Sequence, residues 1–195
     1  RPPRVGIPVA TRPRSLRRRG LRRQTAGNTA ETGAWHTGRD MQRTIEIRTD
    51  DLSGEATRRL IALHLAGMHD TSPPESVHAL GIDALRHPSL SVWTAWIDGE
   101  LAGVGALKAL DADRGEIKSM RTDDRFRGTG VGRALLRHIV DDARRRGMSS
   151  LWLETGTTED FAPAQRLYES EGFVVCGPFE DYALDPFSVF MTRTL

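Results

Sequence analysis

A glycine-rich turn flanked by arginines is the part of this 195-residue chain whose residue types point most directly to chemistry. Gly128, Gly130 and Gly132 stand just before a segment with helical periodicity. Because glycine has no Cβ, the backbone can turn tightly there and direct several N–H groups to one place in front of a helix N-terminus. The turn therefore predicts a binding site for an anion such as a diphosphate. Three arginines flank the turn and could add charged hydrogen bonds: Arg125, Arg127 and Arg133.

Two common nucleotide-binding motifs do not fit the spacing of this turn. A P-loop requires Gly-Lys-Ser/Thr at its end, and no lysine follows Gly130. A dinucleotide-binding fold requires Gly-x-Gly-x-x-Gly after the first strand, whereas this chain has Gly-x-Gly-x-Gly after three strand-like segments. Two alternatives remain open, namely a pyrophosphate site of the form Arg-x-x-Gly-x-Gly and a basic helix N-terminus that binds no ligand.

The segments around the turn alternate between strand and helix patterns. Asp98-Gly99 favours a tight hairpin turn between two of the strands. A helix joins the strands at 116–122 and 151–153, so these strands must be parallel, and their C-terminal ends should face one crevice together with the helix N-terminus. Strands are predicted at 43–48, 91–97, 101–107, 116–122, 151–153, 173–176 and 188–192, and helices at 53–68, 77–86, 131–146 and 161–171.

The formal net charge of +2 hides an uneven distribution of charge along the chain. Residues 1–40 contain 10 arginines and 2 acidic residues, so residues 41–195 carry 18 basic and 24 acidic side chains. An acidic domain with local arginines suits a small anionic ligand better than a nucleic acid, which needs an extended basic face.

Residues 1–40 lack apolar periodicity, so we expect a disordered arginine-rich extension there and one folded domain over 41–195. We favour Met41 as the natural start, with the preceding residues as an added extension. A transit peptide and a nucleic-acid-binding arm stay open as alternatives. The arm would give a salt-dependent affinity for DNA that disappears on deletion of residues 1–40.

Composition excludes several other classes of protein. No run of about 18 apolar residues is present, so we expect no membrane span. The single cysteine, Cys176, excludes an internal disulfide and agrees with a cytoplasmic location. His64 and His69 do not have the i, i+4 spacing of a helical zinc pair, so no metal site is expected.

Two motifs together resemble the GNAT superfamily of coenzyme A-dependent N-acetyltransferases. They are Arg125-x-x-Gly128-x-Gly130 and Ala164-x-x-Leu167-Tyr168-x-x-x-Gly172-Phe173. The resemblance covers residues 43–195. Further segments at 116–120, 153–156 and 178–191 resemble a bacterial, largely uncharacterised subgroup of this superfamily.

The resemblance implies a fold and a cofactor. The fold would be the α/β GNAT fold, a mixed central sheet of six to seven strands with flanking helices, in which the parallel fourth and fifth strands splay around acetyl-CoA. The backbone of Met120 and Thr122 would bind the pantetheine arm, and an N–H near Met120 would polarise the thioester carbonyl. The pyrophosphate would lie on the turn and the helix start, that is on Arg127, Gly128, Thr129, Gly130, Val131, Gly132 and Arg133.

The resemblance also implies candidate catalytic residues. Glu116 and Glu154 compete for the role of general base, and an ordinary ion-pairing carboxylate is the alternative for each. Tyr168 corresponds to a residue that protonates the departing thiolate in relatives, and its alternative role is helix packing. Relatives often carry Asn at the position of Phe161, where it contacts the cofactor.

The acceptor pocket is implied to lie between the first two helices and the loop before the last strand. The polar residues in these segments are His69, Glu75, His78, Asp181 and Tyr182. Each of them has a simple surface or capping role as its alternative.

The predicted function is therefore an acetyl-CoA-dependent N-acetyltransferase that moves an acetyl group to a primary amine by direct transfer in a ternary complex. The acceptor would be a small-molecule or peptide amine, and family habit suggests a homodimer. The alternative from another class is a non-catalytic acyl-CoA-binding or regulatory module that lacks a competent base.

Overall fold

The computed structural model describes residues 44–71, 73 and 78–195 of the chain. The predicted extension over residues 1–40 lies outside the described residues, as does Glu75. Within the described part, a single mixed sheet of seven strands carries the fold.

The strands are arranged in the order β1-β2-β3-β4-β5-β7-β6. All neighbouring strands are antiparallel except β4 and β5, which are parallel, as the sequence predicted. Their bounds are β1 Glu46–Thr49, β2 Leu90–Ile97, β3 Glu100–Ala109, β4 Arg114–Thr122, β5 Ser150–Gly156, β6 Val174–Cys176 and β7 Ser188–Thr194.

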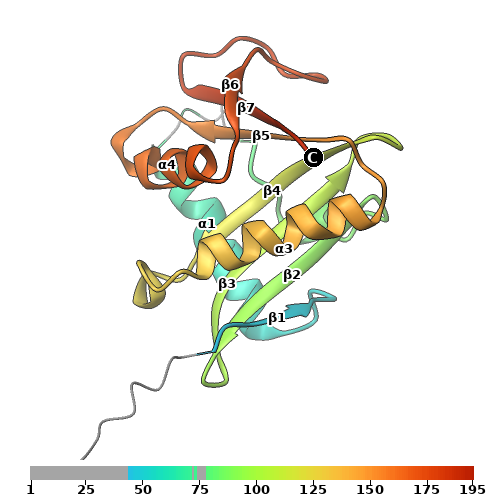
Figure 1. The fold of residues 1–195 in the computed structure, drawn as a ribbon. Helices are drawn as coiled ribbons and strands as arrows, with labels where there is room; N and C mark the ends of the chain where they lie inside the picture. The colour runs from blue at the N-terminus through green and yellow to red at the C-terminus, as the bar shows by residue number, and fades with distance from the viewer. Residues whose placement is uncertain (1–43, 72, 74–77) are drawn as a thin grey trace, which may run out of the picture. The chain divides into compact units, whose positions relative to one another are not determined.

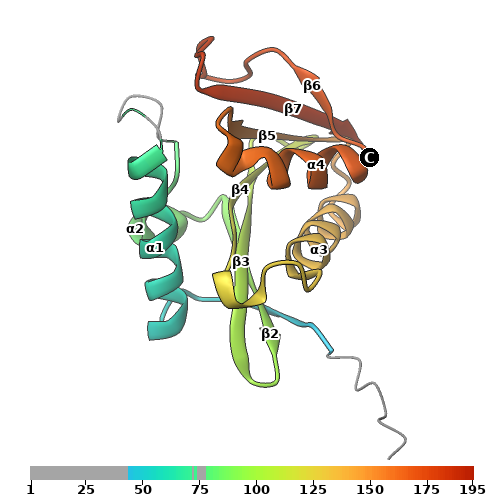
Figure 2. The same ribbon diagram turned by 90° about the vertical axis from the view of Figure 1, so that its left-hand side faces the viewer.

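Helices cover both faces of the sheet. Figures 1 and 2 show α1 and α2 on one face, and α3 and α4 on the other. The helices are α1 Glu55–Thr71, α2 Ile82–Leu85, α3 Val131–Arg145 and α4 Ala162–Ser170, with 3-10 turns η2 Asp124–Phe126 and η3 Glu159–Phe161.

Each face of the sheet has its own apolar cluster. On the α3 face, the helix stripe of Val131, Leu135, Ile139 and Ala143 is fully buried, because residues four apart fall on one side of a helix. On the α1 face, a second cluster combines α1, α2 and the sheet, and it includes Leu60, Ile61, Leu85, Val104 and Ala106. The sheet is therefore a rigid middle layer, on which functional side chains can be held in fixed positions.

Local turn chemistry explains where the predicted elements hold and where they do not. Asp98 and Gly99 have φ values of 52° and 81°, as a tight hairpin turn with two left-handed residues requires, and they join β2 to β3. The helix predicted over 77–86 is wrong in extent, because α2 has only four residues. The difference lies at the start, because residues 78–81 are not helical and α2 begins at Ile82 with Gly81 as its N-cap, while Pro88 agrees with the predicted end of the helix.

Candidate active site

The glycine turn places several backbone donors in front of α3. Gly128 and Gly130 have φ values of 77° and 91°, in the left-handed region that favours glycine, and α3 begins at the next residue. Among the described residues, no acceptor is bonded to the N–H groups of Gly128, Gly130, Val131, Gly132 and Arg133. Five N–H donors at the positive end of a helix fit a pyrophosphate group.

The arginines around the turn are already paired with carboxylates. Arg125 contacts Glu100 at 2.7 Å and Asp123 at 3.1 Å. Arg127 contacts Asp124 at 2.6 Å, and Arg133 contacts Glu171 at 3.0 Å. The backbone therefore supplies one donor set at the turn, and the exposed arginines keep further guanidinium N–H groups that could add to it.

The two parallel strands separate beside this turn. Pairing of β4 with β5 runs from Arg114↔Ser150 to Ile117↔Leu153 and then stops, although β4 continues to Thr122 and β5 to Gly156. Beyond Ile117, the edge of β4 that faces β5 has no strand partner among the residues that the structure describes, so its backbone groups could bind a ligand. This is the splayed arrangement that the resemblance to the GNAT superfamily implied.

An irregularity in β4 marks the gap. The register with β3 passes from Ala106↔Lys118 to Val104↔Arg121, so β4 has one extra residue there. Ser119 adopts a φ of 53° in this bulge, and its buried hydroxyl has no hydrogen-bond partner among the described residues. The next residue is Met120, whose side chain packs into the α3-side core while its backbone stays at the open edge.

Helix α4 closes the other side of the gap. A Cβ built on Gly132 would lie 3.3 Å from the Leu167 side chain and 3.5 Å from the Thr122 hydroxyl, so α3, α4 and the end of β4 meet there. Phe161, at the position of the family asparagine, lies against Gly156, and Gln165 Nε2 donates to the Gly156 carbonyl at 2.7 Å.

Tyr168 and Glu154 are two titratable groups close to the gap. Tyr168, on α4, is 6% exposed, and its hydroxyl has no hydrogen-bond partner within the described part of the chain. Burial raises the pKa of Tyr168, and the nearby charge of Glu154 raises it further. The phenol therefore keeps its proton at neutral pH and can act as a donor.

Glu154 lies on β5 at the first position after the strands separate. Ser188 Oγ donates a hydrogen bond to its Oε1 at 2.8 Å. Burial raises the pKa of Glu154, while the bond from Ser188 and the charge of Lys118 work in the opposite direction. A carboxylate whose pKa moves toward neutrality is suited to the role of a general base.

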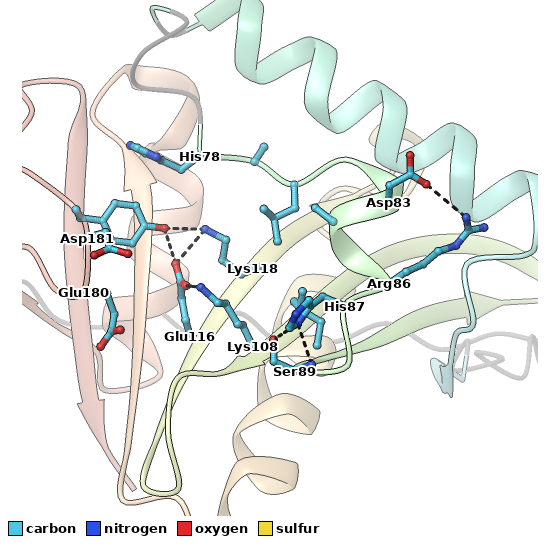
Figure 3. Close-up of a pocket in the computed structure, with 15 residues that line it drawn as sticks. His78, Asp83, Arg86, His87, Ser89, Lys108, Glu116, Lys118, Glu180 and Asp181 are labelled. Carbon is cyan, nitrogen blue, oxygen red and sulfur yellow. Dashed lines mark hydrogen bonds and ion pairs between the residues drawn. The ribbon is translucent and has the colours of Figure 1, made fainter.

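Glu116, the competing base candidate, is held by other side chains. It is 2% exposed, and its Oε1 accepts from the Tyr182 hydroxyl at 2.5 Å and from Lys118 Nζ at 3.0 Å (Figure 3). Lys118 Nζ also donates to the Tyr182 hydroxyl at 2.7 Å. Lys108 Nζ lies 3.9 Å from the second oxygen of Glu116. With Oε1 hydrogen-bonded in this way and the second oxygen facing Lys108, Glu116 holds these three side chains together.

A cavity of about 750 Å³ opens on the α1 face next to Glu116. Of the residues predicted for an acceptor pocket, His78, Asp181 and Tyr182 line this cavity, whereas the exposed His69 does not. Burial, and then the charge of Lys118, lower the pKa of His78. Several further charged or polar residues line the cavity and were not predicted from the sequence: Asp83, Arg86, His87, Ser89, Lys108, Lys118 and Glu180.

The sequence could have predicted that one of these residues, Lys118, lies beside Glu116. Glu116 and Lys118 are two residues apart on a strand, so they share one face of the sheet. Lys108 lies directly opposite Glu116 in the register of β3 with β4, and such a pairing is settled only by the fold.

Two negative findings concern the described residues alone. Residues 44–71, 73 and 78–195 contain no group of three or more His, Cys, Asp or Glu side chains placed to hold a metal ion. In the same ranges, no helix has the length and apolar character needed to span a bilayer.

Comparisons with known proteins agree with this architecture. The family model described as Acetyltransferase (GNAT) family matches residues 56–173. A Bacillus subtilis protein named uncharacterised N-acetyltransferase YsnE is 51% identical over 151 residues, which are 77% of this chain and 100% of that protein. The Escherichia coli N-acetyltransferase YedL, also named uncharacterised, is 48% identical over 149 residues, covering 76% of this chain and 94% of that protein.

A solved structure gives the same result at the level of the fold and the family. The putative acyl-CoA N-acyltransferase of Klebsiella pneumoniae superposes with a TM-score of 0.64 at 27% identity, over 77% of this chain and 97% of that one. The separated parallel strands, the glycine turn at α3 and these relatives lead to one conclusion: the chain belongs to the GNAT family of acetyltransferases.

Proposed function

We propose that the protein transfers the acetyl group of acetyl-CoA to a primary amine by direct transfer within a ternary complex. The observation that carries this proposal is the position of Glu154 and Tyr168 near the gap between β4 and β5, next to the N–H donors of the glycine turn. Acetyl-CoA would supply an activated thioester. The N–H groups from Gly128 to Arg133 would hold its pyrophosphate, and the open edge of β4 at Met120 and Thr122 would bind the pantetheine arm.

The two titratable groups divide the proton transfers between them. Glu154 takes a proton from the attacking amine, either directly or through one water molecule, because its raised pKa makes it a stronger base than an exposed glutamate. Tyr168 keeps its proton at neutral pH and donates it to the departing thiolate. Glu116 does not serve as the base in this proposal, because its carboxylate is occupied by Tyr182 and Lys118.

Direct transfer is supported by the position of the chain's single cysteine. Cys176 lies on β6, and the strand order places β5 and β7 between β6 and β4. This thiol is therefore remote from the edge of β4, and no acyl-cysteine is needed to explain the arrangement.

The test is the release of the coenzyme A thiol by the full chain, followed with a thiol reagent over a panel of primary amines. Mass spectrometry of the products verifies that the amine, not water, receives the acetyl group. Turnover of at least one amine, with linear initial rates and no burst, supports the proposal. Binding of acetyl-CoA without turnover of any amine would refute it and favour the non-catalytic acyl-CoA-binding module.

A further inference from the structure

The two lysines of the chain come together at one place. Of 28 lysine and arginine residues, only Lys108 and Lys118 are lysines, and both line the cavity on the α1 face. One comes from β3 and the other from β4, and Figure 3 shows both side chains converging on Glu116. An ammonium is a compact point charge, in contrast to the broad planar guanidinium that the chain uses elsewhere.

The floor of the cavity carries an excess of positive charge. Lys118 Nζ is 3.0 Å and Lys108 Nζ is 3.9 Å from the same carboxylate, so one negative charge faces two positive ones. The Lys118 side chain is only 10% exposed, and solvent therefore compensates its charge poorly. A partly desolvated positive charge of this kind is stabilised by an anion.

The two ammonium groups also keep hydrogen-bond donors available. An ammonium has three N–H donors, and Lys118 uses two of them, one on Glu116 and one on the Tyr182 hydroxyl. At 3.9 Å, the contact of Lys108 with Glu116 is an ion pair but too long for a hydrogen bond. Glu116 and Tyr182 thus hold Lys118 in place while one donor stays available, and Lys108 retains all of its donors in the described part of the chain.

The acidic residues of the cavity do not cancel this excess. Asp83 is almost fully exposed and pairs with Arg86 at 3.5 Å, and Figure 3 shows both on the far side of the cavity from Glu116. Glu180 pairs with Arg114 at 2.8 Å, and Asp181 is exposed to solvent. Charges at such exposed positions interact weakly with the floor.

The register of the strands links this floor to the reacting amine. Ile117↔Leu153 is the last pair of β4 and β5, so Lys118 and Glu154 are the next residues, one on each strand. Side chains alternate along a strand, and both therefore point to the face opposite Ile117 and Leu153, which belong to the α3-side core. Glu154 does not line the cavity itself, but it is near enough to Lys118 for the lysine charge to act on its carboxylate, so one small molecule could contact both residues.

We propose that Lys108 and Lys118, fixed by Glu116, bind the carboxylate of the acceptor, so that the acceptor is a free amino acid. This inference rests on the proposed function. Lys118 and Lys108 hold the carboxylate, Glu154 receives the proton of the amine, and the side chain of the amino acid extends into the cavity toward α2. An amine without a carboxylate lacks the contact with the lysines and binds more weakly.

A binding experiment that needs no turnover reads the two lysines directly. The full chain is produced with 13C-labelled lysine, which yields two ε-methylene signals in an NMR spectrum, and it is titrated in the presence of coenzyme A. The ligands are free L-amino acids and their decarboxylated counterparts, such as L-tyrosine with tyramine and L-phenylalanine with 2-phenylethylamine, and also O-phosphoethanolamine. We expect at least one amino acid to shift both signals while its decarboxylated counterpart does not. The carboxylate assignment would be overturned if none of the amino acids shifts the lysine signals, or if only O-phosphoethanolamine does.

Steady-state kinetics of matched variants are the second test of the carboxylate assignment. For the amino acid acceptor, Lys108→Met raises KM about tenfold or more with little change in kcat, because a hydrogen bond to a charged group is lost. Lys108→Arg recovers much of the affinity, and the same Lys108→Met change leaves KM for the decarboxylated amine unaltered. Arg59→Met, which removes a positive charge on the exposed face of α1 outside the cavity, is the control and behaves as wild type.

The outcomes separate this inference from the proposed function. Equal acetylation of amino acids and of their decarboxylated counterparts would overturn the carboxylate assignment and leave the acetyltransferase intact. If acetyl-CoA binds and no amine is acetylated, the proposed function fails, and the NMR titration still decides whether the lysines bind a carboxylate.

Discussion

Replacing Glu154 by glutamine should lower activity and raise stability at neutral pH. The substitution keeps the shape of the side chain, and the amide oxygen can still accept the hydrogen bond that Ser188 Oγ donates at 2.8 Å. What disappears is a carboxylate that burial makes hard to ionise. Loss of a general base lowers kcat by about 10²- to 10⁴-fold, which corresponds to about 3 to 5 kcal/mol of barrier.

The stability effect has a defined sign and pH window. The folded-state pKa of Glu154 is raised above the ordinary value of 4.5, so the folded protein binds more protons than the unfolded chain between 4.5 and the raised pKa. The stability of the wild type therefore falls as pH rises through this window, and the penalty is fully present above it. Glutamine carries no such penalty, so the variant should have the higher Tm at pH 7.5 and nearly the same Tm as wild type below pH 4.5.

The assay compares kcat for the best acceptor and Tm from pH 4 to pH 9 for wild type, Glu154→Gln and the control Glu159→Gln. Glu159 lies on the exposed turn η3, a few residues along the chain from Glu154, and its replacement should change neither quantity. A Glu154→Gln variant with wild-type kcat would refute the assignment of the base. If the Tm of Glu154→Gln at pH 7.5 were below that of wild type, ionisation of the Glu154 carboxylate would not destabilise the folded protein.

Three further predictions concern the remaining parts of the site. Tyr168→Phe should reduce kcat about 100-fold or more. Its Tm should stay within a few degrees of wild type, because the removed hydroxyl makes no hydrogen bond to any residue that the structure describes. Unchanged turnover would eliminate the role of Tyr168 as the acid. Glu116→Gln should lower the free energy of unfolding, measured with urea, by about 3 kcal/mol, because the buried charge of Lys118 loses its carboxylate partner. A loss below about 0.5 kcal/mol would show that Glu116 does not anchor the cavity. Gly130→Val should lower stability by about 1 to 2 kcal/mol, because the φ of 91° at this position is strained for a branched residue. The variant should also bind acetyl-CoA more weakly in calorimetry. Wild-type affinity would show that the turn is not part of the acetyl-CoA site.

Local sequence signals were sufficient to predict the elements around the glycine turn. Asp98-Gly99 specifies its hairpin through left-handed backbone, and the apolar stripe of α3 specifies the buried face of that helix. A helical crossover between two strands forces them to be parallel, so the pairing of β4 with β5 also followed from the order of elements.

The acceptor side could not be predicted to the same extent, because its parts are distant in the sequence. Tyr182 reaches Glu116 across 66 residues, and Lys108 reaches it through the register of β3 with β4. The insertion of β7 between β5 and β6 brings the loop with Tyr182 to this place, and no local pattern encodes that strand order. The short α2, which ends before Pro88, likewise depends on how the chain enters β2.

The binding of acetyl-CoA by the full chain tests the central claim most directly, and thermal unfolding with and without the ligand measures it. At about 100 times Kd, the ligand should stabilise the protein by about 2.7 kcal/mol, which raises Tm by about 5 to 10 °C at this chain length, whereas ADP should have a much smaller effect. No shift at millimolar acetyl-CoA, or an equal shift with ADP, would contradict the assignment of the glycine turn and the gap between β4 and β5 as the acetyl-CoA site.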